Sequence, residues 1–150
     1  MKNHHIRLGT TEDIEQWLIL RKVFWPNCSD SQHRLEMGQV VLSSGGVFVA
    51  EDPKGRLIGF AEFSIRNDYV PGADISPVPY LEGWFVNEEY WAKGVGRKLL
   101  AAVEDWSRQN GYTQIASDAL IDNATGVEIH RKLGFTEVVR TAHFIKRIGN

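Results

Sequence analysis

The chain has 150 residues, of which 43% are hydrophobic and 24% charged, as expected for one soluble globular domain with a sizeable core. The formal net charge of -2 and the lack of any run of Lys or Arg argue against a nucleic-acid partner. Cys28 is the single cysteine, which excludes a disulfide framework and a thiolate metal cluster. The sequence has no apolar signal region and no apolar run long enough to span a bilayer. We therefore expect a cytoplasmic protein with no membrane partner and no metal.

The first half of the chain predicts two helices and a hairpin. Thr10 is placed to cap the first helix, with Asp13 three residues later as in a capping box. A tight turn with the letters DPKG separates two apolar runs, which is typical of a hairpin. The expected elements are a short strand near Ile6–Leu8, a helix ending at about Phe24, a helix over Gln32–Leu42, and strands over Val47–Glu51 and Leu57–Ile65.

The second half reads as a strand–loop–helix–strand unit that follows a loop rich in Pro, Gly and Asp over 67–79. Apolar residues recur at helical spacing from Val95 to Trp106. The expected elements are a strand over Tyr80–Val86, a helix over Val95–Asn110, a strand over Gln114–Ser117, a helix over Ala124–Leu133, and one or two strands within Thr136–Lys146. This order predicts an α/β (α+β) fold with a mixed, mostly antiparallel sheet, in which Tyr80–Val86 and Gln114–Ser117 form a central parallel pair.

Two glycines, Gly94 and Gly96, open the helix at 95–110. Unpaired N–H groups and a partial positive charge at a helix N-terminus favour an anion such as a phosphate. The chain lacks the G-x-x-x-x-G-K-[ST] pattern of a P-loop. A Rossmann fingerprint is disfavoured because Leu99 stands where close helix–strand packing needs a small residue, although Asp118 follows the next strand as a ribose-binding acid would.

The segment WAKGVG, from Trp91 to Gly96, resembles the [QR]-x-x-G-x-[GA] motif of the GNAT superfamily of N-acetyltransferases, with Trp91 in place of the usual Gln or Arg. A second segment, N-A-x5-H-R-K-L-G-F from Asn123 to Phe135, resembles the next motif of that family, with His130 in the place of its tyrosine. The resemblance implies a single GNAT-like domain over residues 1–150. It also implies that backbone amides of the loop hold the pyrophosphate of acetyl-CoA.

Two longer segments narrow the resemblance to one branch of bacterial aminoglycoside 6'-N-acetyltransferases. They are SIRNDYVPGADISPVPYLEGWFV at 64–86 and ASD…DN…HRKLGF at 116–135, and that branch also carries the histidine found here at His130. The resemblance implies direct acetyl transfer from acetyl-CoA, the co-substrate, to a primary amine of a polycationic aminoglycoside, in a homodimer. The positions that match acceptor contacts of the family are Trp25, Tyr69, Glu82 and Asp118. Val139 stands where the family has a further carboxylate, with Glu137 two residues earlier on the same face of the expected strand.

The chemistry of amine acetylation selects the same carboxylates. An alkylamine has a pKa of about 10 and must lose a proton before it attacks a thioester. Asp118 and Glu82 lie on the two parallel strands, near the crevice where ligands of α/β proteins bind. We assign Asp118 as the base, with Glu82 as its rival and His130 as the acid for the leaving thiolate. The alternative for Asp118 is a helix or turn cap, that for Glu82 is a charge on the strand surface, and that for His130 is a packing or hydrogen-bonding residue.

The cofactor-binding residues follow from the motif and from the strand before it. Gly83 predicts a bulge or a close backbone approach, and in the family the free backbone of this strand pairs with the pantetheine arm. The expected contacts are Trp84, Phe85, Val86, Trp91, Ala92, Lys93, Gly94, Val95, Gly96, Arg97 and Asn123. Packing in the strand and capping of the next helix are the alternatives for Trp84–Val86 and for Asn123.

Two other functions stay open. The first is a GNAT enzyme that acetylates another polyamine or a small amine. A degenerate GNAT domain binds acetyl-CoA as a sensor without turnover. The presence of Glu82, Asp118 and both glycines argues against the sensor.

Overall fold

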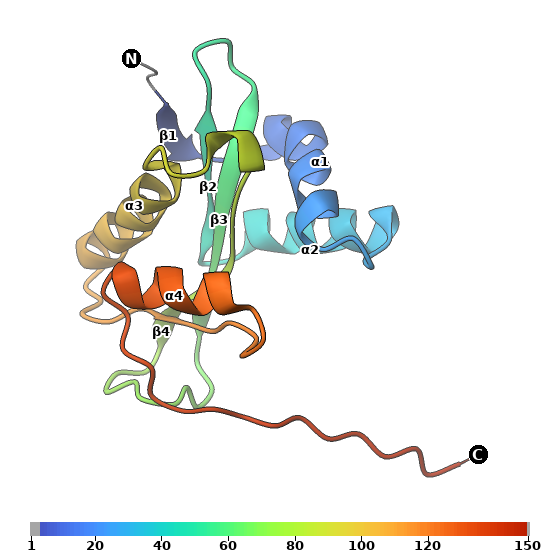
Figure 1. Cartoon of the computed structure of the whole chain (residues 1–150), viewed down its shortest axis with the longest axis vertical. Helices are drawn as coiled ribbons and strands as arrows, with labels where there is room; N and C mark the ends of the chain where they lie inside the picture. Colours follow the sequence, from blue (N-terminus) through green and yellow to red (C-terminus); the bar gives the residue numbers. More distant parts are fainter. Residues whose placement is uncertain (1–3, 150) are drawn as a thin grey trace. The chain divides into compact units, whose positions relative to one another are not determined.

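The strands form one sheet in the order β1-β2-β3-β4-β5 in the computed structural model, which describes residues 4–149 (Figure 1). The first four strands are antiparallel neighbours, and β4 and β5 are parallel. Their bounds are His5–Leu8 for β1, Gly46–Glu51 for β2, Leu57–Arg66 for β3, Val78–Val86 for β4 and Ala116–Ser117 for β5. The mixed, mostly antiparallel sheet with one parallel pair is therefore confirmed. The predicted central place of that pair is wrong: it lies at one end of the strand order, because no strand follows β5 within the described residues.

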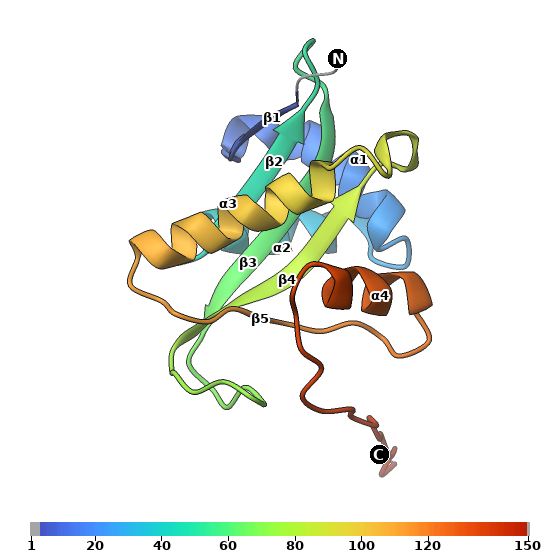
Figure 2. The ribbon, with the colours of Figure 1, turned by 60° about the vertical axis from the view of Figure 1, so that its left-hand side comes forward.

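Two helices cover one face of the sheet and a third covers the other (Figure 2). On the first face lie α1 (Ile14–Phe24) and α2 (Asp30–Leu42), and on the second lies α3 (Val95–Gln109). Short 3-10 turns, η1 (Thr11–Asp13) and η2 (Glu88–Tyr90), precede α1 and α3. The described residues divide into two compact units, 4–118 and 119–149, and α4 (Ala124–Lys132) belongs to the second.

The predicted cap at Thr10 is present as a capping box. The Thr10 side chain accepts from the Glu12 amide at 3.3 Å, and the Thr10 amide donates to Asp13 Oδ2 at 2.8 Å. Arg7 on β1 donates to both oxygens of Asp13, at 2.7 and 2.8 Å. This guanidinium holds the pKa of Asp13 below its usual range, although burial opposes it. The start of α1 is thus fastened to the edge of the sheet.

Apolar side chains fill the spaces on both faces of the sheet. The cluster under α1 and α2 contains Trp17, Leu18, Leu20, Met37, Val47, Val49, Leu57 and Phe60. Helix α3 buries the face that its periodicity predicts, with Val95, Leu99, Leu100 and Val103 almost inaccessible to solvent. Trp106, at the far end of this face, packs on Phe63 with ring centroids 4.8 Å apart. This burial is the main stabilising contribution to the sheet and its three helices.

Strand β4 contains the irregularity predicted at Gly83. Leu81 pairs with Phe63 and Gly83 pairs with the preceding residue, Glu62, so Glu82 is one extra residue in β4. A Cβ atom at Gly83 would lie 2.4 Å from Cη2 of Trp25, so only glycine fits beneath this indole. The predicted bulge is confirmed, whereas the atoms close to Gly83 belong to side chains and not to another backbone.

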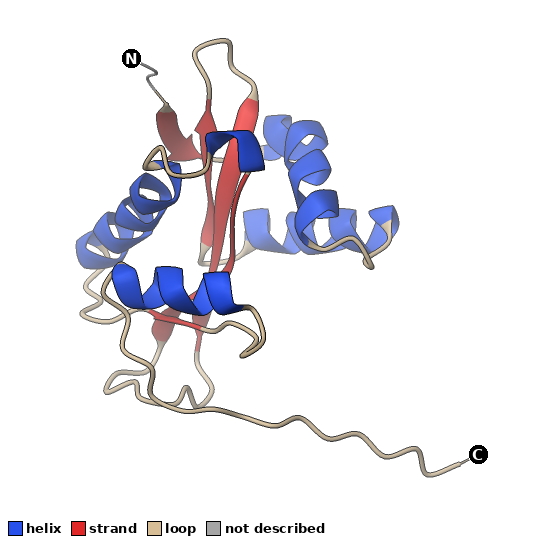
Figure 3. Ribbon diagram, in the orientation of Figure 1, coloured by secondary structure: helices blue, strands red, loops and turns tan. Residues whose placement is uncertain are grey.

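Two strand predictions fail. The segment after α4 contains no strand, so the prediction for Thr136–Lys146 is wrong (Figure 3). An extended segment needs a hydrogen-bonded neighbour, and no strand lies within the described residues 119–149 of this unit. Strand β5 is shorter than the predicted Gln114–Ser117, since only Ala116 and Ser117 pair with β4. The Gln114 side chain accepts from the Asp74 amide at 2.7 Å and contacts the loop at 67–77.

Candidate active site

A carboxylate and a guanidinium form a two-pronged pair at the bulge of β4. Arg66 on β3 donates from Nε and Nη2 to the two oxygens of Glu82, at 2.8 and 2.7 Å. The Ser64 hydroxyl donates to Glu82 Oε2 at 2.5 Å. The hydrogen bond to Glu82 raises the pKa of Arg66, so this residue stays charged. Glu82 is accessible to solvent, but both of its oxygens already accept hydrogen bonds.

The second carboxylate lies beside the same guanidinium. Tyr80 on β4 donates its hydroxyl proton to Asp118 Oδ2, across the parallel pair of strands. Arg66 covers the Tyr80 ring, with the guanidinium carbon 3.5 Å from the ring centroid. Burial, and next the hydrogen bond to Asp118, raise the pKa of Tyr80, so its hydroxyl stays protonated and acts as a donor. Asp118 is exposed at the end of β5 and keeps its other oxygen for a further partner.

This acidic cluster, defined as Glu82 and Asp118 with their partners Arg66 and Tyr80, offers two different carboxylates. Glu82 is held rigidly by charge-assisted hydrogen bonds. Asp118 is oriented through one oxygen and is open to solvent. Such a pair can bind an ammonium group and accept a proton from it.

Aromatic surfaces lie next to the acidic cluster. Trp25, at the C-terminal end of α1, rests on Gly83 directly after Glu82 in β4. Tyr69 lies in the loop after β3 and is 86% exposed. Its neighbour Val70 is buried against Tyr80, which ties this loop to the acidic cluster. Flat, partly exposed rings of this kind can cover a sugar ring or face a cation.

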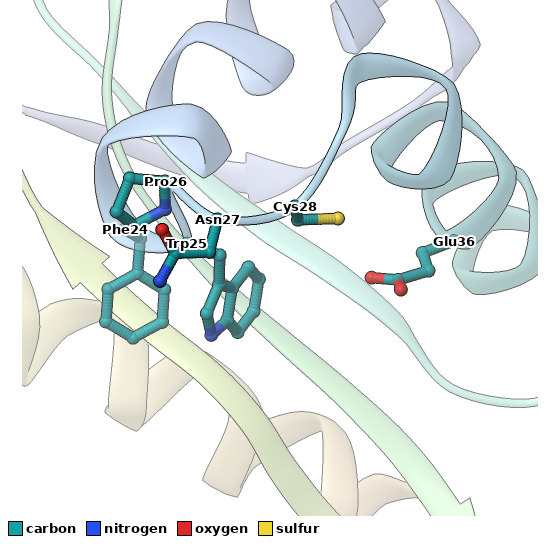
Figure 4. Close-up of a pocket in the computed structure, with 6 residues that line it drawn as sticks. All are labelled: Phe24, Trp25, Pro26, Asn27, Cys28 and Glu36. Atoms are coloured by element: carbon teal, nitrogen blue, oxygen red, sulfur yellow. The ribbon is translucent and has the colours of Figure 1, made fainter.

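A concave pocket of about 580 Å³ lies at the end of α1 and in the turn that leads to α2 (Figure 4). The rings of Phe24 and Trp25 lie on one side, and Glu36 of α2 lies on the other with Cys28 between. The pocket is lined by Phe24, Trp25, Pro26, Asn27, Cys28 and Glu36. Its walls therefore combine an aromatic surface with a carboxylate.

The mouth of α3, defined as the loop 91–97 at the N-terminal end of this helix, has the features of an anion-binding site. Gly94 caps the helix with φ of 83°, in the left-handed region that favours glycine. The first backbone bond of the helix runs from the Lys98 amide to the Gly94 carbonyl at 3.1 Å, so the amides before Lys98 have no acceptor within the helix. The first turn carries no acidic side chain. A phosphate placed there would meet N–H donors and the positive end of the helix dipole.

Two tryptophans brace this mouth. The indole N–H of Trp91 donates to the Val86 carbonyl at 2.8 Å, and that of Trp84 donates to the Gly96 carbonyl at 3.0 Å. Trp91, which departs from the family pattern, thus ties the loop to the end of β4. A Cβ at Gly96 would make only ordinary contacts, the nearest being 3.6 Å from Trp84 Nε1, so the packing of the protein leaves room for a methyl there.

The edge of β4 beside β5 is paired over only a short stretch. β5 pairs with Tyr80 and Leu81, and no described strand continues alongside β4 past Leu81 on that side. Trp84, Phe85 and Val86 continue β4 to the loop that leads to Gly94. Extended backbone of this kind can pair with the amides of an extended ligand arm.

Asn123 and His130 lie in the second unit and have local partners there. The Asn123 side chain accepts from the Gly126 amide at 3.0 Å and caps α4, so its capping role is observed. His130 Nδ1 lies 2.7 Å from the Gly126 carbonyl, and its ring packs on Phe135 with centroids 5.0 Å apart. Val139 is exposed outside any strand, so its predicted shared strand face with Glu137 is not formed.

Sequence reasoning missed two members of the acidic cluster, Arg66 and Tyr80. The signal was present in the antiparallel register, which pairs Ser64 with Tyr80 and Arg66 with Val78. Arg66 is therefore a diagonal neighbour of Tyr80, and its long side chain extends past this residue to Glu82. It was hidden because the bulge breaks the alternation of β4, and sequence alone does not fix on which side of Gly83 the extra residue falls.

The Acetyltransferase (GNAT) family profile matches residues 11–135. An aminoglycoside N(6')-acetyltransferase type 1 of Stenotrophomonas maltophilia is 40% identical over 139 residues, which cover 93% of this chain and 90% of that protein. The chain belongs to the GNAT acetyltransferase family. Acetyl-CoA is the co-substrate of this family, and the chain is an acetyl-CoA-dependent N-acetyltransferase.

Solved structures of related GNAT enzymes share the whole fold. The aminoglycoside N-acetyltransferase AAC(6')-Iy in complex with CoA superposes with a TM-score of 0.92 at 36% identity, covering 98% of this chain and 97% of that one. The same enzyme with a bisubstrate analogue of CoA and monomethyl-acetylneamine gives a TM-score of 0.90 at 37% identity, covering 97% and 99%. Both comparisons confirm the predicted GNAT fold.

Within residues 4–149, no group of three or more His, Cys, Asp and Glu side chains is arranged to hold a metal ion. Over the same residues, no helix is both long and apolar enough to cross a bilayer.

Proposed function

We propose that this GNAT enzyme transfers the acetyl group of acetyl-CoA to the 6'-amine of aminoglycosides and so confers antibiotic resistance. The observation that carries the proposal is the acidic cluster with Trp25 and Tyr69 beside it, on the strand that leads to the mouth of α3. An aminoglycoside presents several ammonium groups on sugar rings, which carboxylates and flat aromatic side chains recognise. The names and ligands of the relatives support the same substrate class.

The donor half of the reaction is assigned to the end of β4 and the mouth of α3. Backbone amides at the loop 91–97 hold the pyrophosphate of acetyl-CoA, and the backbone of Trp84–Val86 pairs with the pantetheine arm. One N–H of this strand faces the thioester oxygen and stabilises the oxyanion as charge develops there. Asn123 is proposed as a further cofactor contact in addition to its capping role.

Asp118 is the proposed base. Its free oxygen takes a proton from the 6'-ammonium, and the neutral amine attacks the thioester carbonyl. A C–N bond forms, the C–S bond breaks, and the thiolate of CoA takes a proton, for which His130 is the proposed donor. Glu82 is the weaker choice as base because Arg66 and Ser64 occupy both of its oxygens. We assign Glu82 to hold a neighbouring ammonium group.

The test is an assay of free CoA release over a panel of aminoglycosides, polyamines and simple amines, with 6'-hydroxyl aminoglycosides as matched acceptors that lack the reacting amine. We expect turnover with 6'-amino compounds and none with their 6'-hydroxyl counterparts. Turnover confined to polyamines would show that the acceptor is a polyamine and not an aminoglycoside. Acetyl-CoA binding without any turnover would indicate a sensor. The cytoplasmic location and the homodimer stay predictions, which cell fractionation and light scattering would test.

A further inference from the structure

Three polar side chains are buried within the apolar cluster beneath α1 and α2. Arg21 of α1 is 2% exposed, Glu62 of β3 is 4% exposed, and His33 of α2 is fully buried. Such groups are costly to remove from water, and well-packed apolar residues of similar volume often serve stability equally well. Stability of the core therefore does not explain why these three polar residues are buried, and the contacts they make indicate another role.

Hydrogen bonds connect the three side chains in one chain of contacts. Arg21 Nη1 donates to Glu62 Oε1 at 3.3 Å, and Arg21 Nε donates to His33 Nδ1 at 3.1 Å. Because His33 Nδ1 accepts this bond, its proton is on Nε2, which lies 3.2 Å from the Trp25 carbonyl and donates to it. Trp17 donates to Glu62 at 2.9 Å and completes the partners of that carboxylate.

This buried network, defined as Arg21, His33 and Glu62, ends at Trp25 from two directions. The Arg21 guanidinium lies over the Trp25 ring at 4.8 Å, and His33 holds its carbonyl. Glu62 is the residue that pairs with Gly83, on which the same indole rests. The network thus holds both the aromatic ring and the strand position beneath it.

We propose that Arg21, His33 and Glu62 are positioning residues, which set the Trp25 indole over Gly83 and thereby tune acceptor binding without touching the acceptor. This inference rests on the proposed function, because it assumes that Trp25 contacts the aminoglycoside. Within residues 4–149, the hydrogen bonds of the network connect its members to one another and to Trp17, Trp25 and Glu36, all of which lie outside the mouth of α3. A disturbance of the network should therefore reach the acceptor and leave acetyl-CoA binding unchanged.

Two substitutions of His33 separate the contacts. His33→Asn keeps an acceptor near the place of Nδ1 for Arg21 but is too short to reach the Trp25 carbonyl. His33→Gln places its amide N–H near the position of Nε2 and keeps the bond to Trp25. We expect His33→Asn to raise the acceptor KM by about 5- to 20-fold, as loss of one buried hydrogen bond allows. The acetyl-CoA KM should stay within about twofold, and His33→Gln should restore the acceptor KM.

A double-mutant cycle with Trp25→Ala distinguishes positioning of Trp25 from a merely structural role, because it measures whether the effect of His33→Asn on the acceptor KM depends on Trp25. If His33 acts through Trp25, then His33→Asn should add nothing to the acceptor KM in the Trp25→Ala background. The control is Arg34→Ala, which breaks the exposed pair of Arg34 with Glu15 between the same two helices but does not touch the network. It should leave the acceptor KM unchanged. Should His33→Asn fail to fold, Arg21→Lys carries the same expectations, since lysine cannot bond His33 and Glu62 in one fork.

Three results would overturn the inference: an unchanged acceptor KM in a folded His33→Asn variant, equal effects on both substrates, or effects that multiply in the double variant. The assays use an aminoglycoside on which the wild-type enzyme turns over. Failure of the wild-type enzyme with every aminoglycoside would instead contradict the proposed function, and the two failures are thereby distinguished.

Discussion

Gly94 and Gly111 provide a matched pair for testing the anion site. They lie beyond opposite ends of α3, with φ of 83° and 85°, and a Cβ built on either residue would meet nothing within 4 Å. Alanine at either position should therefore cost only the backbone strain of a left-handed residue, about 1–2 kcal/mol. The two variants should unfold with similarly reduced free energies.

Their effects on acetyl-CoA should differ. At Gly94 the strained backbone turns the first amides of α3 away from the pyrophosphate, whereas Gly111 lies at the C-terminal end of the helix. A hydrogen bond to a charged group is worth about 1.5–3 kcal/mol, so loss of one should raise the acetyl-CoA KM about 10- to 100-fold. The Gly111→Ala variant should keep the wild-type KM.

The assay combines initial rates of CoA release with denaturant unfolding of each variant. It distinguishes loss of the site from loss of the fold, because only the first is specific to one end of the helix. A normal acetyl-CoA KM in folded Gly94→Ala, or an equal rise in Gly111→Ala, would refute the assignment of the pyrophosphate to this helix.

Further substitutions test the chemical step and the buried carboxylate. Asp118→Asn is nearly isosteric and should keep the acetyl-CoA KM while it lowers acceptor kcat/KM by about 10²- to 10⁴-fold with an altered pH profile, as expected for a general base; loss of acceptor affinity alone would show that Asp118 only anchors the amine. Burial raises the pKa of Glu62 from 4.5 to about 7, against the opposing effects of Arg21 and Trp17. Because the folded state then holds this proton more tightly than the unfolded state, the stabilisation is complete below about pH 4.5 and is lost as the pH rises through about 7. Urea unfolding over this range should show a fall of up to about 3 kcal/mol in the wild-type protein that is absent in Glu62→Gln, and identical pH dependence of the two proteins would contradict the raised pKa.

Local patterns were sufficient to predict most of the elements. The helix after Thr10, the hairpin at DPKG and the periodic helix at 95–109 each follow from chemistry within a few residues. The strands expected after α4 were not formed, because a strand depends on a neighbour that no local pattern specifies.

The candidate site divides in the same way. The glycines at the mouth of α3 and the bulge at Gly83 can be predicted from the sequence, because glycine marks positions where the backbone is left-handed or irregular. The sequence did not predict the hydrogen bonds of Arg66 to Glu82 and of Tyr80 to Asp118, because they form only when β3, β4 and β5 come together. The network beneath Trp25 joins α1, α2 and β3, and helical periodicity predicts an apolar side chain at Arg21 rather than a charge.

The extra residue in β4 also separates the strand into two segments with independent alternation. Val78–Leu81 pair with β3 in one phase, and Gly83–Val86 pair in the other. Under the proposed function, the first segment, Glu82 and Gly83 beneath Trp25 serve the antibiotic, and Trp84–Val86 serve the acetyl donor. Substitutions near Tyr80 can then change which drugs fit without shifting the backbone that holds the acetyl donor. A resistance enzyme with this arrangement can broaden its drug range through point mutations. Deletion of one residue at the bulge would put the two segments in one phase and disrupt both the acceptor site and the donor site.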